Sequence, residues 1–350
     1  TAPFSHLNAM PLAFCFPSPL RGGASPIIQR YSPSLPSFSS PARPLPRPPT
    51  AQTFSDSRTF KKYMTFLETG SDPECPQLPD RPSVIIGAGR IGDLLNMLAE
   101  APGDDVVLRR GDSFPNDLPK DTPIYVATRN DVLESVIEMV PEERREDLVF
   151  LQNGMLEPFL RKHGLADPKT SIANIYFAVP KLGADPIDGK TPSSPDGLTC
   201  ATGKWAHAFA ERLHRGGLSC TVAGSNDFRR SMLEKLIWIC VFMLIGSVHG
   251  NKSVGDVATF HRKEVDEMVT ELGHFVKYTL AVGMLPDLTE RLCQYAMAVK
   301  DFPTAVKEFE WRNGYFYEWS MLARKKGVDD QLPMHTEYLE SGKEMGKINF

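Results

Sequence analysis

The sequence predicts an α/β domain with a mostly parallel sheet, followed by an all-helical domain. Between residues 83 and 224, short apolar segments alternate with segments of helical periodicity, the pattern of buried strands joined by covering helices. From residue 225 onward, only helical periodicity remains. We therefore divide the chain into a leader (1–55), a lead-in helix and proline-rich linker (56–82), the α/β domain (83–224) and the helical domain (225–350).

The leader differs from the rest of the chain in composition. It contains 12 Pro and four Arg, with no Asp, Glu or Lys, so the chain's formal charge of −4 divides into +4 for the leader and −8 for the remainder. Arginine, serine and proline without acidic residues are typical of an organellar transit peptide, and the abundant proline favours the chloroplast over the mitochondrion. A disordered tail without a targeting role is the alternative. The acidic remainder argues against nucleic-acid binding.

The α/β domain is expected to contain seven short strands and three helices. The apolar strand segments are 83–86, 106–108, 124–128, 148–151, 172–179, 198–202 and 219–222. The helical segments are 93–101, 132–139 and 205–214. Because the strand segments are almost continuously apolar, we expect both faces of the sheet to be covered.

The helical domain is expected to begin with a long buried helix, capped by Ser225 and ended by Gly250. Its apolar run, 236–248, is shorter than the ~20 residues that span a bilayer, so we expect a core helix and no membrane contact. Scattered histidines and six cysteines without a C-x-x-C pair predict no metal site. Two helical stripes are predicted to be buried: Val265, Met268, Val269, Leu272 and Val276, and then Phe316, Trp319, Leu322 and Ala323.

A glycine-rich motif follows the first predicted strand and opens the first helix. It reads Gly87-Ala88-Gly89-Arg90-Ile91-Gly92. In this setting the first glycine makes the turn, the second admits a pyrophosphate and the third allows close helix–strand packing. The free N–H groups of the helix then face the phosphates. The motif predicts a Rossmann-type dinucleotide site at residues 87–92; a glycine-rich turn without a ligand is the alternative.

The end of the second predicted strand indicates which dinucleotide binds. An NAD site usually has an acidic residue there for the ribose 2′-hydroxyl, but Arg109 and Arg110 follow this strand. Two guanidinium groups suit a 2′-phosphate. We therefore expect NADP(H), with a solvated surface pair as the alternative.

Four features together make the chain resemble the ketopantoate reductase family. They are the glycine-rich opening, Gln152-Asn153-Gly154, an apolar helix with one lysine, and Lys307-Glu308-Phe309-Glu310-Trp311-Arg312-Asn313-Gly314. The last segment is similar to the family's T-E-I-D-x-x-N-G, and the resemblance covers approximately residues 83–345. It implies a Rossmann domain, a helical domain and an active site in the cleft between them, where a 2-keto acid is reduced with NADPH.

The resemblance also implies roles for individual residues. The catalytic lysine of the family falls on Lys235, its active-site glutamate on Glu308 and its cofactor-side asparagine on Asn153. The lysine of its second dinucleotide loop is replaced by Thr128, followed by Arg129. Independently of the family, burial in an apolar helix lowers the pKa of a lysine toward neutrality, as a proton donor to a carbonyl requires. The alternatives are a snorkelling lysine paired with Glu234 and a solvated Glu308.

Three positions depart from the family. Its pocket asparagines, four and eight residues after the lysine, fall on Ile239 and Met243, and its substrate-binding serine falls on Ala296. Loss of three hydrogen-bonding groups should cost several kcal/mol of recognition of a hydroxylated keto acid. Either the substrate is more apolar or catalysis has been lost.

Together these observations favour an NADPH-dependent reductase, an oxidoreductase that converts a small 2-keto acid or related carbonyl compound and has an altered pocket. A catalytically silent NADP(H)-binding sensor or scaffold is the alternative. The expected partner is a small-molecule substrate, with neither nucleic acid nor membrane, and a homodimer is compatible with this interpretation.

Overall fold

The structure, a computed structural model, describes residues 61–62, 64–65, 72–101, 103–115 and 119–350. The described residues belong to one compact unit. The predicted leader and most of the predicted lead-in helix lie outside the described residues.

A seven-stranded sheet forms the centre of the α/β domain. Its strands are β1 (Val84–Ile86), β2 (Val106–Leu108), β3 (Ile124–Val126), β4 (Leu148–Phe150), β5 (Ser171–Asn174), β6 (Cys200–Thr202) and β7 (Thr221–Val222). The order across the sheet is β2-β1-β3-β4-β5-β6-β7. Strands β1 to β5 are parallel, β6 runs antiparallel to β5, and β7 pairs in parallel with β6. The predicted mostly parallel sheet is confirmed.

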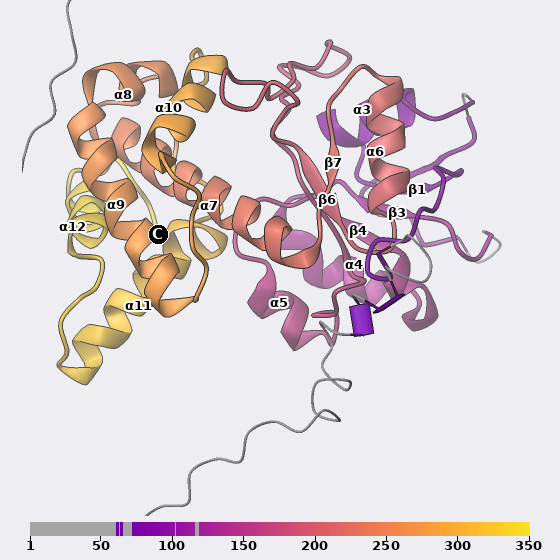
Figure 1. The fold of residues 1–350 in the computed structure, drawn as a ribbon, viewed down its shortest axis with the longest axis horizontal. Coiled ribbons are helices and arrows are strands. Elements are labelled where there is room, and N and C mark those ends of the chain that lie inside the picture. Colours follow the sequence, from indigo (N-terminus) through magenta and orange to yellow (C-terminus); the bar gives the residue numbers. More distant parts are fainter. Residues whose placement is uncertain (1–60, 63, 66–71, 102, 116–118) are drawn as a thin grey trace, which may run out of the picture. The chain divides into compact units, whose positions relative to one another are not determined.

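Helices cover the sheet because its strands are apolar on both faces. They are α3 (Arg90–Met97), α4 (Leu133–Met139), α5 (Glu157–Lys162) and α6 (Ala206–Arg215). One core contains Trp205 and Phe209 of the α6 region together with α3 residues, and the core on the other side contains α4 and α5 residues. In Figure 1 the sheet with these helices lies to the right, and the remaining helices lie to the left.

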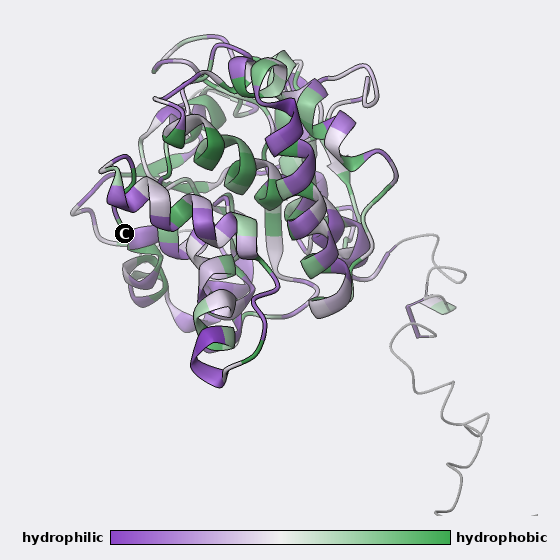
Figure 2. Cartoon of the chain, turned by 90° about the vertical axis from the view of Figure 1, so that its left-hand side faces the viewer, coloured by the Kyte–Doolittle hydropathy of each residue, from purple (hydrophilic) through white to green (hydrophobic). Residues whose placement is uncertain are grey.

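The helical domain is built around one long helix, α7 (Ser225–Val248). Around it pack α8 (Val254–Phe260), α9 (Arg262–Thr279), α10 (Leu288–Ala298) and α12 (Pro333–Glu344), and α11 (Asn313–Lys326) packs against α12. By length and composition α7 could cross a membrane, but 78% of its apolar window is buried inside the protein. It is a core helix, as predicted. Figure 2 shows hydrophobic and hydrophilic residues alternating along the outer helices, as expected where one helix face is buried.

A buried ion network joins α6 to the first strands. The Arg212 side chain is 1% exposed, and its Nε and Nη1 lie 3.0 Å from Asp80 Oδ2 and 2.7 Å from Asp105 Oδ2. Asp105 Oδ1 also accepts hydrogen bonds from the backbone N–H and the hydroxyl of Ser83, at 2.8 Å and 2.7 Å. The guanidinium therefore has a carboxylate on each side, which offsets the cost of burying its charge.

Several predicted details are wrong. Ser225 does not cap α7, because Gly224 holds the cap position and the Ser225 hydroxyl donates to Glu74 Oε2 at 3.0 Å. The strand predicted at 172–179 ends at Asn174, and the helix predicted from residue 93 begins at Arg90. The stripe at 265–276 is buried as predicted, but Trp319 and Leu322 are exposed, because that face of α11 looks outward.

Candidate active site

The glycine-rich loop has the geometry that the motif predicts. Gly87 adopts φ +110° and its N–H donates to Leu108 O at 2.9 Å, so the chain turns between β1 and α3. A Cβ on Gly92 would lie 1.8 Å from Gly87 O, so only glycine allows helix and strand this close. At Gly89, the residue before the first turn of α3, a Cβ would meet no neighbouring atom within 4 Å. This loop leaves room for a phosphate group at the helix N-terminus.

Two neighbouring loops meet the glycine-rich loop where β1, β3 and β4 end. The Gln152 amide donates to Val126 O and Thr128 O at 2.8 Å and 3.1 Å, which fixes the loop after β3 beside the loop after β4. The Asn130 amide likewise donates to Asn153 O at 2.9 Å. The Thr128 hydroxyl is buried and has no hydrogen-bond partner among the described residues. Parallel sheets commonly bind ligands at this position, where the strand order reverses.

Four other predicted cofactor residues lie near this edge in different settings. Arg90 donates to Val179 O and Pro180 O at 2.9 Å and 3.1 Å, so it links α3 to the segment after β5. Ile91 packs against the core, and Ala88 is half-buried. Arg129 is exposed and pairs with Asp131 at 3.0 Å. The side chains of Arg90 and Arg129 are thus already engaged with protein groups.

Arg109 and Arg110 follow β2 and are both exposed. Within the part of the chain that the structure describes, neither guanidinium makes a hydrogen bond or an ion pair. The Arg109 backbone N–H donates to Asp112 Oδ2 at 2.7 Å, which brings a carboxylate to the same turn. Sequence reasoning overlooked Asp112, although it stands 20 positions after Gly92.

Lys235 lies in the middle of α7, where only 6% of the residue is exposed. Its Nζ donates to Ile175 O and lies 4.7 Å from the centre of the Tyr176 ring. Burial, together with the positive charge of Arg312, lowers the pKa of Lys235 to about 7. The predicted depression of this pKa is confirmed, and its main cause is the predicted loss of hydration. Lys235 does not pair with Glu234, which instead binds Arg291 at 2.7 Å.

Glu308 lies in the segment that joins the helical domain to the loops after β3 and β4. It has φ +48° and precedes the 3₁₀ helix η3 (Phe309–Trp311). Its Oε1 accepts the Asn130 backbone N–H at 3.0 Å, and its Oε2 pairs with Arg312. The Met155 N–H donates to Trp311 O at 2.7 Å, which fastens the same segment to the loop after β4. Glu308 is therefore not a solvated helix residue.

Arg312 is a site residue that sequence reasoning missed. Its side chain is 14% exposed, and its Nε is buried without a hydrogen-bond partner among the described residues. It pairs with Glu308 and its charge acts on Lys235, so it stands close to both predicted catalytic residues. The signal in the sequence was the position of this arginine, between Trp311 and Asn313. The Asn313 amide fixes the segment by donating to Cys240 O at 3.1 Å.

The three positions that depart from the family lie in apolar surroundings. Ile239 and Ala296 are buried and Met243 packs against the same core. Beside them the Trp238 ring lies 4.7 Å from that of Tyr295 and stacks on Phe242 at 5.5 Å. Aromatic side chains thus surround the region next to Lys235.

A cavity of about 280 Å³ opens between α5, β5 and the first half of α7. Lys235, Gln152 and Gly154 line it, together with polar groups of Asn174 and Thr202. Apolar residues also line it, among them Leu156, Leu160, Leu165, Ile172, Met232 and Leu236, and charged side chains of Glu157, Arg161, Asp167 and Arg229 lie in the same lining. The cavity therefore brings the lysine and the loop after β4 to one space that suits a small, partly apolar molecule.

The fold is that of a two-domain dehydrogenase with a Rossmann-type domain and a helical domain. More particularly, the chain has the fold of the ketopantoate reductases. It is similar to 2-dehydropantoate 2-reductase from Methylococcus capsulatus, with a TM-score of 0.54 and 14% identity over 77% of this chain and 98% of that one. The predicted resemblance and fold class are confirmed at the level of the fold.

Two further solved structures are similar to this chain. D-mandelate dehydrogenase with NADH and anilino(oxo)acetate has a TM-score of 0.51 at 12% identity, over 75% of this chain and 99% of that one. Dimeric ketopantoate reductase from Staphylococcus aureus has a TM-score of 0.51 at 13% identity, over 75% and 99%. No protein-family model and no curated protein sequence matches the chain.

Proposed function

We propose that this protein is an NADPH-dependent reductase of a 2-keto acid with an apolar substituent. The observation that carries the proposal is Lys235, a buried lysine with a pKa of about 7 beside the loop after β4. A proton donor works best when its pKa lies near the operating pH. The similarity to ketopantoate reductases and to D-mandelate dehydrogenase, whose structure contains an anilino(oxo)acetate, supports a 2-keto acid as the substrate class.

The residues present fit a nicotinamide dinucleotide. The open space at Gly89, the N–H groups at the start of α3 and the Thr128 hydroxyl lie together where β1 and β3 end, and this hydroxyl has no partner in the part of the chain that the structure describes. Gly87–Gly92 would hold the pyrophosphate, and Thr128 and Asn153 would contact the nicotinamide half. Bound NADPH would supply a hydride to the keto carbon.

The chain's own residues would complete the reduction. The Lys235 ammonium would donate a proton to the carbonyl oxygen as negative charge develops there. The Arg312 guanidinium, with one buried N–H unpartnered among the described residues, would attract the substrate carboxylate. Glu308 would hold Arg312 in place through their ion pair. The product would be a 2-hydroxy acid.

The substrate's substituent is proposed to be apolar. Leu156, Leu160, Met232 and Leu236 line the cavity beside Lys235 and offer no hydrogen bonds. Behind them, the family's polar groups are replaced by Ile239, Met243 and Ala296 of the apolar core. A hydroxylated substituent would lose its hydrogen bonds to water without replacement. We therefore expect aromatic or branched aliphatic 2-keto acids to be better substrates than ketopantoate.

The proposed preference for NADPH rests on Arg109 and Arg110. Both guanidinium groups are exposed at the end of β2, where the adenosine ribose lies in Rossmann domains. The Asp112 carboxylate accepts the Arg109 backbone N–H at the same turn, so an acidic side chain stands beside the two arginines.

A catalytically silent NADP(H)-binding protein is the second candidate. It is favoured by the contacts of the two predicted catalytic residues, because Lys235 donates to Ile175 O and Glu308 is held by Arg312 and Asn130. In such a protein these contacts would be structural, and dinucleotide binding would serve sensing or assembly.

We also propose that the leader directs the protein to the chloroplast, and that the protein forms a homodimer. The leader's arginine-, serine- and proline-rich composition without acidic residues supports the first proposal. Intact-mass measurement of the protein from its native tissue should show loss of roughly residues 1–55, and retention of Thr1 would refute the targeting proposal.

Sedimentation velocity tests the proposed homodimer.

Stopped-flow oxidation of NADPH against a panel of 2-keto acids tests the proposed activity. The panel should include ketopantoate, branched aliphatic and aromatic members. Turnover with the apolar members supports the reductase. NADPH binding without turnover on any member supports the silent binder, and absence of dinucleotide binding refutes both.

A further inference from the structure

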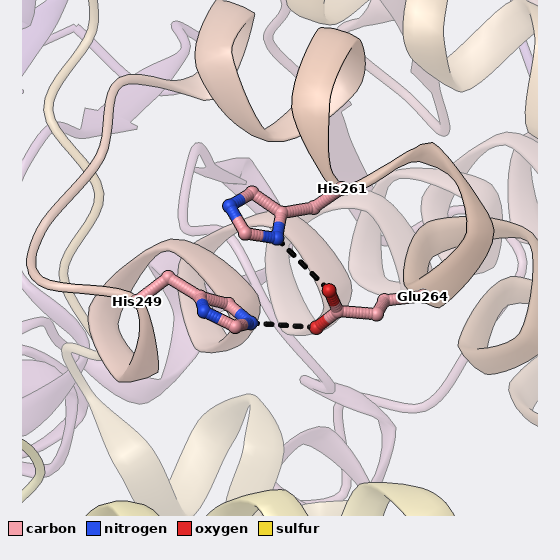
Figure 3. A group of neighbouring side chains, drawn as sticks. All are labelled: His249, His261 and Glu264. Atoms are coloured by element: carbon pink, nitrogen blue, oxygen red, sulfur yellow. Dashed lines mark hydrogen bonds and ion pairs between the residues drawn. The ribbon is translucent and has the colours of Figure 1, made fainter.

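Three potential metal ligands meet at the end of α7, away from the candidate active site. His249 is the C-cap residue that follows α7, His261 joins α8 to α9, and Glu264 lies in the first turn of α9. Figure 3 shows both imidazole rings turned toward the Glu264 carboxylate. Sequence spacing does not reveal this group, because His249 comes from another helix.

The donor atoms lie close enough to share one ion. His249 Nε2 is 2.6 Å from Glu264 Oε2, and His261 Nδ1 is 2.9 Å from Glu264 Oε1. One donor atom from each of the three residues lies within 4.8 Å of the other two. Ligands bound to one cation at about 2.0–2.2 Å must lie this close together. The rings are stacked, with centroids 3.9 Å apart and planes 26° apart, so one ring would rotate to turn its lone pair toward the shared ion.

The Glu264 carboxylate supplies the negative charge that a bound cation at this position requires. The neighbouring arginine is directed elsewhere, because Arg262 binds Asp266 and Glu290 at 3.2 Å and 3.1 Å. Among the described residues, no lysine or arginine pairs with Glu264.

The surroundings hold the carboxylate in place. The Tyr338 hydroxyl, from α12, donates to Glu264 Oε2. Hydrogen bonds of this kind orient the ligands in protein metal sites. The side chains of His249 and Glu264 remain 34% and 26% exposed, so a cation and a water ligand can reach the group from solvent.

We propose that His249, His261 and Glu264 form a binding site for a divalent transition-metal ion of the zinc class. Two imidazole nitrogens and one carboxylate are a donor set that suits zinc, with the fourth position left to water. The cation would take the place of the protons that now lie between the imidazoles and the carboxylate. His249 lies 14 positions after Lys235, about 21 Å along α7. The ion would therefore link α7 to α9 and stabilise the helical domain, without entering the proposed reduction.

Calorimetric titration of the untagged, chelator-treated full chain with ZnCl₂ tests this site. We expect one Zn²⁺ per chain, and at least a tenfold loss of affinity in each of the variants His249→Ala and Glu264→Gln. His274→Ala is the matched control, because His274 is an exposed histidine on the same helix as Glu264, and it should leave the affinity unchanged. Zinc binding by the wild type that both variants retain would overturn the proposal, and so would absence of binding.

The absorption spectrum of the wild-type chain with Co²⁺ tests the proposal without any variant. A three-residue site with one water should give the intense visible bands of four-coordinate cobalt. The weak spectrum of the hydrated ion, at a protein concentration that exceeds the metal, would overturn it. Melting curves in chelator show whether the two variants fold.

Discussion

Substitution of Lys235 by Met should stabilise the fold, and by more at low pH than at high pH. The pKa of Lys235 is about 7 in the folded protein and 10.5 without the fold. Between these values the unfolded chain binds more protons, so the stability of the wild type rises with pH. Burial of Lys235 costs roughly 5 kcal/mol at pH 6, at about 1.4 kcal/mol per pKa unit, and about 2 kcal/mol at pH 9, where the buried amine is neutral but the unfolded chain is still protonated. The variant lacks this cost.

Urea unfolding of the wild type and Lys235→Met at pH 6 and pH 9 measures the effect. The difference between their free energies of unfolding should shrink by about 3 kcal/mol from pH 6 to pH 9. The pH-independent part of losing the hydrogen bond to Ile175 O cancels in this comparison. Lys325→Met, at an exposed lysine of α11, should show no such change. A difference that is constant with pH would refute the depressed pKa.

Two further predictions concern the cofactor and the fold. The double variant Arg109→Ala, Arg110→Ala should weaken NADPH binding by roughly 1.5–3 kcal/mol per lost contact and leave NADH binding nearly unchanged. Calorimetric titration measures both affinities. Equal losses for the two nucleotides would place these arginines away from the 2′-phosphate. Asp105→Asn leaves the buried Arg212 with one carboxylate partner, and should lower the free energy of unfolding by about 3–5 kcal/mol in urea titration. An effect below about 1 kcal/mol would contradict the assigned charge pairing.

Features that depend on local chemistry could be predicted from the sequence. The turn at Gly87 and the close packing at Gly92 follow from the order strand, glycine motif, helix. The lowered pKa of Lys235 follows from its place in an apolar run, because such a helix is buried on all sides. Neither inference requires knowledge of which distant residues come into contact.

Features that depend on distant contacts could not be predicted. The Asn130 N–H and Glu308 are 178 positions apart, and no local pattern indicates that they meet. Serine is a residue type that commonly caps helices, but the Ser225 hydroxyl donates a hydrogen bond to Glu74, 151 positions earlier. The histidine–glutamate group was missed because His249 and Glu264 belong to different helices.

The central claim is that Lys235 donates a proton in the reduction of a 2-keto acid. Single-turnover oxidation of NADPH by the wild type and by Lys235→Met, on the best substrate of the panel, tests it most directly. We expect the rate to fall by about 10²–10⁴ in the variant, the effect of removing an acid–base or electrostatic group, while NADPH affinity stays within a few-fold. An unchanged rate in the variant would contradict the assigned role of Lys235.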